Sequence, residues 1–116
     1  MIRIQVWRGE EGMVLLTQGH AGYAEAGKDI VCAGVSVLLY GFWSYLETQS
    51  RLCGKGDVHA DELDGGLYVR SHGFEGRDIQ AWEVMRAGIC LLSQCYPKNV
   101  NYVENYLCEE ETDWKK

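Results

Sequence analysis

The chain has 116 residues, of which 47% are hydrophobic and 24% are charged, and this length fits a single domain that can bury a core. Its formal net charge is −6, which disfavours direct contact with nucleic acid or with an anionic membrane. We therefore treat residues 1–116 as one domain, with an acidic and mobile tail expected over about 109–116.

The first two expected elements are strands. Ile2, Ile4 and Val6 alternate with Arg, Gln and Trp, which is the period of a half-buried strand. A turn separates them from a second strand over 13–18, so the two strands predict an antiparallel hairpin. The opening MIRIQVW is typical of a strand and not of a secretory signal. The five cysteines, an odd number that argues against a disulfide framework, then indicate the reducing cytoplasm.

The third expected element is a long apolar helix. Asp29 is a good N-cap, and the helix should run over 30–51. The uncharged part, 30–46, has 17 residues, whereas a membrane span needs about 20, so we interpret it as a core helix. Because the helix is apolar on almost every side, one sheet and one further helix cannot cover it. We expect a second copy of the chain to cover the rest, in a homodimer.

The later elements complete the fold class. They are strands over 57–63 and 67–72, a helix over 76–96 and a final strand over 100–107. The turn Asp64-Gly65-Gly66 predicts that the two middle strands form a hairpin. The order ββαββα, with a last β, predicts a two-layer α+β fold in which the helices pack on a mainly antiparallel sheet.

The stretch GHAGYAEAGKDIVCAG, residues 19–34, carries the candidate chemistry. Its segment from Gly22 to Lys28 fits G-x-x-x-x-G-K, the beginning of a phosphate-binding loop. The next residue should be Ser or Thr, to bind magnesium, but it is Asp29, whose carboxylate repels phosphate. We therefore disfavour nucleotide binding. The histidines and cysteines also lack the spacing of a zinc site, and we expect no cofactor and no metal.

A cysteine and a histidine in this stretch favour nucleophilic chemistry. Cys32 would be the third residue of the helix, where free N–H groups and partial positive charge favour a thiolate and can stabilise an oxyanion. His20 ends the preceding strand, and the loop can bring it back to Cys32 as a base. The spacing alone, however, fits a buried structural cysteine on an apolar helix better than it fits a catalytic pair of Cys32 and His20.

Two further residues have open roles. Asp29 caps the helix and can also orient His20, and the two roles are compatible. Ser36 lies one turn after Cys32, where its hydroxyl either bonds back to the Cys32 carbonyl or serves as a polar neighbour of the site. Glycines give the loop conformational freedom, which suits an enzyme that admits an extended peptide. The expected substrate-binding loop comprises Gly19, Gly22, Tyr23 and Gly27.

The order G-H, a glycine loop and then G-K-D-I-V-C-A-G-V-S resembles the ribosomal-processing cysteine protease Prp family. The positions that carry the resemblance are Gly19, His20, Gly27, Asp29, Ile30, Val31, Cys32, Ala33, Val35 and Ser36. The chain length, the ββαββα order and the Y-P-K at 96–98 are also similar to that family, so the resemblance covers nearly the whole chain. Gly34 departs from it, since the family often has alanine there.

The resemblance implies a cytoplasmic, homodimeric cysteine endopeptidase of Firmicutes-type bacteria. The family removes a short N-terminal extension from large-subunit ribosomal protein number twenty-seven, which supports ribosome assembly. By resemblance, Cys32 is the nucleophile, His20 is the base, and the cleaved segment is apolar and contains phenylalanines. The alternative is a non-catalytic ribosome-associated binding module that uses the same groove. Such a module would not need the pair of His20 and Cys32.

Overall fold

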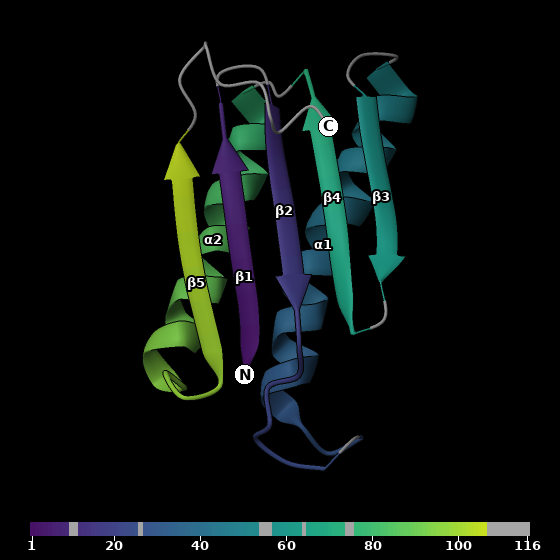
Figure 1. The fold of residues 1–116 in the computed structure, drawn as a ribbon. Coiled ribbons are helices and arrows are strands. Elements are labelled where there is room, and N and C mark those ends of the chain that lie inside the picture. The colour runs from purple at the N-terminus through teal and green to yellow at the C-terminus, as the bar shows by residue number, and fades with distance from the viewer. Residues whose placement is uncertain (10–11, 26, 54–56, 64, 74–75, 107–116) are drawn as a thin grey trace.

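The computed structural model describes residues 1–9, 12–25, 27–53, 57–63, 65–73 and 76–106, and shows a five-stranded sheet with two helices on one face (Figure 1). The α+β class and the order ββαββα followed by β are confirmed. The predicted acidic tail, 109–116, lies outside the described residues. The elements are β1 (Ile2–Arg8), β2 (Gly12–Gln18), α1 (Ile30–Cys53), β3 (Asp57–Leu63), β4 (Gly66–His72), α2 (Gly76–Cys95) and β5 (Val100–Tyr106).

The strand order in the sheet is β3-β4-β2-β1-β5. Both predicted hairpins are confirmed, because β1 pairs antiparallel with β2 and β3 pairs antiparallel with β4. Strand β5 pairs parallel with β1, with Ile2 opposite Val100, so the sheet is mixed at this edge. This pairing brings the last strand of the described chain next to the first, and the start of β5 lies beside the start of β1 (Figure 1).

The core lies between the sheet and the two helices. Alternate residues of β1 point into it, and Ile4 and Val6 are fully buried. Val6 lies opposite Leu15 of β2, which in turn lies opposite Val69 of β4, so buried side chains form rows across the strands. Helix α1 adds a stripe at helical spacing. Its members are Val31, Val35, Leu39, Phe42 and Leu46.

Helix α1 also carries apolar side chains outside the core. By length and composition, Ile30–Leu52 would be able to cross a membrane. In this fold, one of its faces is part of the buried core, as the sequence predicts for a core helix. Its outward side chains include Ile30 and Val37, which are 61% and 72% exposed. A single chain therefore leaves part of this helix uncovered.

Helix α2 is fixed to β5 by a polar cluster. Glu104 of β5 accepts hydrogen bonds from the Arg86 guanidinium of α2 and, at 2.6 Å, from the Tyr102 hydroxyl. The hydrogen bond with Glu104 raises the pKa of Arg86, and burial raises the pKa of Tyr102. Both groups thus keep their protons, and the cluster holds the helix against the edge strand.

Candidate active site

The loop between β2 and α1 turns at glycines. Gly19, Gly22 and Gly27 have φ angles of 92°, 68° and 84°, a region that other residues rarely adopt. A second reason requires glycine at position 19, because a Cβ atom there would lie 2.5 Å from the Met1 carbonyl oxygen. The conformational freedom that the sequence assigns to these glycines is therefore used by the loop.

Asp29 caps α1, as the sequence predicts. Its Oδ1 atom accepts a hydrogen bond of 2.9 Å from the backbone N–H of Cys32, while Oδ2 accepts from the N–H groups of Tyr23 and Ala24 at 3.0 and 3.4 Å. The hydrogen bond from Cys32 is the main reason why the pKa of Asp29 is lowered. One carboxylate thus joins the first turn of the helix to the middle of the loop.

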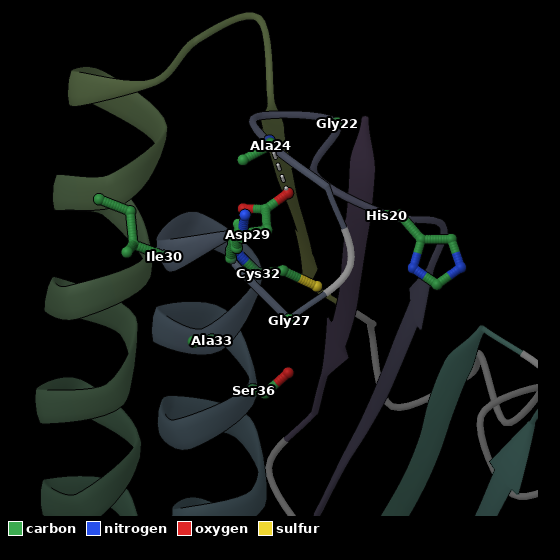
Figure 2. Close-up of a pocket in the computed structure, with 10 residues that line it drawn as sticks. His20, Gly22, Ala24, Gly27, Asp29, Ile30, Cys32, Ala33 and Ser36 are labelled. Carbon is green, nitrogen blue, oxygen red and sulfur yellow. Dashed lines mark hydrogen bonds between the residues drawn. The ribbon is translucent and has the colours of Figure 1, made fainter.

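Cys32 is the third residue of α1 and is half-buried. Its Sγ and the Ser36 hydroxyl point to the same side of the helix, and the His20 imidazole lies on that side (Figure 2). The imidazole is next to the β3–β4 turn, since a Cβ atom on Gly65 would be 3.6 Å from its Nε2. Among the described residues, no hydrogen bond joins His20 to Cys32. The two groups face a common space without touching in this state.

That space consists of two adjoining cavities. A loop cavity of about 600 Å³ is lined by Gly22, Ala24 and residues 27–29 of the loop and by the first turns of α1. A turn cavity of about 250 Å³ lies between α1, the end of β2 and the β3–β4 turn. His20, Cys32 and Ser36 line both cavities. The thiol therefore lies where the cavities meet, with room on either side of it for a bound chain.

The remaining predicted site residues distribute around these cavities. Gly22, Gly27 and Asp29 line the loop cavity, and Gly19 lines the turn cavity. Tyr23 is not among the described residues that line either one. Its ring packs edge to face on Tyr96, with the centroids 5.3 Å apart.

The electrostatic environment of Cys32 combines two opposing influences. The N-terminus of α1 places free N–H groups and partial positive charge next to the thiol, whereas the Asp29 carboxylate adds a negative charge to the same turn. Within the described ranges, no three His, Cys, Asp or Glu side chains are grouped so that they could hold a metal ion. The arrangement suits attack by sulfur with an imidazole as base.

Three anchors of the loop were not predicted from the sequence. Gly65 accepts a hydrogen bond of 2.9 Å from the N–H of Gly19. Asn99 donates its side-chain amide to the Ala21 carbonyl at 2.8 Å, and Tyr96 contacts Tyr23. These contacts join segments far apart in the chain, and neither periodicity nor local motifs indicate which distant residues meet.

Replacing Asp29 by alanine should lower the melting temperature more at neutral pH than in acid. The hydrogen bond from Cys32 lowers the pKa of Asp29 below its usual range, so its stabilising effect is present at neutral pH and is lost as the pH falls through the lowered pKa. The difference in Tm between wild type and Asp29→Ala should therefore shrink as the pH is lowered through this acid range. Asp29→Asn, which keeps an oxygen acceptor, is the control. A difference that does not change with pH would contradict this account of the cap.

Comparison with known proteins points to one family. The family model described as cysteine protease Prp matches residues 1–101. The ribosomal processing cysteine protease Prp of Staphylococcus aureus is 28% identical over 103 residues, which cover 86% of this chain and 95% of that protein. The match thus spans almost the whole of that protease.

Solved structures share the fold. The crystal structure of the S. aureus ribosomal processing protease Prp with a covalently linked product peptide gives a TM-score of 0.71 at 24% identity, covering 92% of this chain and all of that one. A crystal structure of a Streptococcus mutans protein gives a TM-score of 0.66 at 26% identity, covering 92% of this chain and 96% of that one. A further S. aureus Prp structure, with a substrate peptide, gives a TM-score of 0.60.

Proposed function

The chain belongs to the cysteine protease Prp family, and from this membership we propose that it is a cysteine endopeptidase with a Cys32–His20 dyad. The observation that carries the proposal is that both residues line the same two cavities at the N-terminus of α1. We further propose the substrate that the resemblance of residues 19–36 implies. It is the N-terminal extension of large-subunit ribosomal protein number twenty-seven, removed in the cytoplasm.

In the proposed reaction, the His20 imidazole takes the proton from Cys32 Sγ, and the thiolate attacks the carbonyl carbon of the scissile peptide bond. The negative charge that develops on the oxygen is stabilised near the N-terminus of α1. His20 then gives the proton to the leaving amine, and a thioester forms. His20 then takes a proton from water, whose oxygen attacks the thioester carbonyl carbon. The C–S bond breaks, the acyl part of the substrate leaves as a carboxylic acid, and His20 returns the proton to Sγ. The imidazole must first move to Sγ, since the two are not hydrogen-bonded here.

The proposed substrate binds as an extended, apolar segment. The loop and turn cavities on either side of Cys32 provide space for residues before and after the scissile bond. A relative of the same fold has been solved with a substrate peptide, and another structure holds a covalently linked product peptide. Shape would select the bond, while the net charge of −6 would speed the approach of a basic ribosomal protein.

The substrate proposal predicts different effects of side chains and of salt. Replacing the phenylalanines of the extension by alanine should nearly stop cleavage, because the cavities lose their apolar occupants. Raising the salt concentration should lower kcat/KM moderately without moving the cleaved bond, because salt screens charges beyond about 10 Å at 0.1 M. Harmless phenylalanine replacements, with activity that follows net charge alone, would contradict it.

We propose that the protein is a homodimer, with the outer face of α1 in the interface. The exposed Ile30 and Val37 support this, because one chain leaves them uncovered. Light scattering should give about twice the chain mass of 13.1 kDa. Val37→Lys should weaken the dimer, whereas Val103→Lys, at an exposed position on β5, should not. A monomeric wild type at micromolar concentration would contradict the proposal.

The alternative function is a binding module that holds the ribosomal segment without cutting it. The cavities alone would also serve this role. A thiol at the helix N-terminus and an imidazole on the same side favour catalysis, because binding alone requires neither group.

A further inference from the structure

A hydrogen bond ties the loop of the candidate site to the opposite end of the chain. The Asn99 side-chain Nδ2 donates to the Ala21 carbonyl oxygen at 2.8 Å, across 78 positions of sequence. Ala21 directly follows His20 and is 1% exposed, so this is a buried anchor in a loop whose other described residues are mostly exposed. The bond therefore fixes the backbone immediately after the proposed base.

A second bond fixes the backbone immediately before it. The N–H of Gly19 donates to the Gly65 carbonyl oxygen at 2.9 Å, in the turn between β3 and β4. His20 is thus held between two tethers, one from each side of the molecule. The imidazole itself makes no described hydrogen bond, so its position depends on where these tethers place its Cα atom.

Asn99 is itself firmly held. Its N–H donates to the Tyr96 carbonyl at 2.9 Å, and its carbonyl accepts from the N–H of Ile2 at 2.8 Å. Both main-chain groups are therefore bonded, one to Tyr96, which directly follows α2, and the other to β1. The side-chain amide extends from this rigid base to the loop, and Tyr96 adds a ring contact with Tyr23 two residues further on.

We propose that Asn99 is a positioning residue for His20. This inference rests on the proposed function, in which His20 must reach Cys32 Sγ within hydrogen-bond distance. A displacement of about 1 Å at a reacting group can cost a factor of about 100 in rate. Position 99 requires a hydrogen-bond donor, because the loop presents the Ala21 carbonyl oxygen to it. A carboxylate of the same size would repel that oxygen and release the loop.

The test measures the position of His20 separately from catalysis. The protein has three histidines, so their imidazole signals can be assigned by NMR with single substitutions. In Asn99→Ala, the His20 signal should shift and broaden while the signals of His59 and His72 stay unchanged. With the extended ribosomal protein as substrate, kcat should fall about tenfold or more, with KM changed less than about twofold. Asn99→Asp should show the same changes, and it replaces Asn99→Ala in this test if the alanine variant does not fold.

A matched control is available on β5, the strand that Asn99 directly precedes. Asn105 Nδ2 donates to the Val6 carbonyl at 3.3 Å, so Asn105→Ala removes a bond of the same type near the far end of that strand. An unchanged His20 signal in Asn99→Ala, or an equal shift in Asn105→Ala, would overturn the proposal. If the wild type cleaves nothing, the proposed function fails, and the NMR comparison still decides whether Asn99 positions His20.

Discussion

Replacing Cys32 by alanine is expected to abolish cleavage, with a fall in kcat of more than about 10³-fold. Among the residues that the structure describes, Cys32 is the only cysteine that lines the loop and turn cavities, so no other described sulfur can take its place. The fold should survive, because Cys32 is half-buried in the first turn of α1 and alanine is a strong helix former. Circular dichroism and Tm should stay close to those of the wild type.

The matched control is Cys95→Ala, at the exposed end of α2. It should cleave at the wild-type rate. Of the five cysteines, Cys32 should react fastest with iodoacetamide, because its thiol lines both cavities together with His20 at the N-terminus of α1. Normal turnover by Cys32→Ala would end the cysteine protease proposal.

Replacing His20 by alanine is expected to lower kcat by about 10²- to 10⁴-fold. The imidazole would act twice, first as base toward the Cys32 thiol and then as acid toward the leaving amine, so its loss slows both steps. Cys32 should still be alkylated by iodoacetamide, because the helix that carries it is unchanged. A rate assay and a labelling assay on the same sample separate the two effects.

His59→Ala is the control for this substitution. His59 is exposed on β3 and bonds to Asp61 at 3.1 Å, and it lines neither of the two cavities. Its loss should not change the cleavage rate. Wild-type activity of His20→Ala would mean that another group is the base, and His72 would be the remaining histidine to test.

The local elements of the fold could be predicted from the sequence because short-range patterns determine them. Alternation of Ile2, Ile4 and Val6 indicated β1, and the Gly65-Gly66 turn indicated the second hairpin. The long apolar run indicated α1 with its start after Asp29, although it ends at Cys53 and not at 51. The parallel pairing of β5 with β1 was not predicted, because residues about 100 positions apart leave no periodic signal of their contact.

The sequence indicates His20 and Cys32 as candidate residues, and the structure brings both to the same cavities, but the contacts that hold the loop could not be predicted. The predicted helix has Cys32 in its first turn, and the predicted strand has His20 just after its end. Both positions could be predicted because each depends only on a local element. Resting positions of the side chains depend on packing across the molecule, and His20 lies beside Gly65 without a hydrogen bond to Cys32. The hydrogen bond from Asn99 to Ala21 could not be predicted either, because nothing near Asn99 in the sequence indicates a contact with Ala21.

The most direct test of the central claim is the intact mass of the extended ribosomal protein number twenty-seven after incubation with this protein. Wild type should release an N-terminal segment at a single bond, and Cys32→Ala should leave the protein at its full mass. A substrate that stays at full mass with the wild type, while it binds in a pull-down that the Cys32→Ala variant reproduces, would contradict the account and identify a binding module.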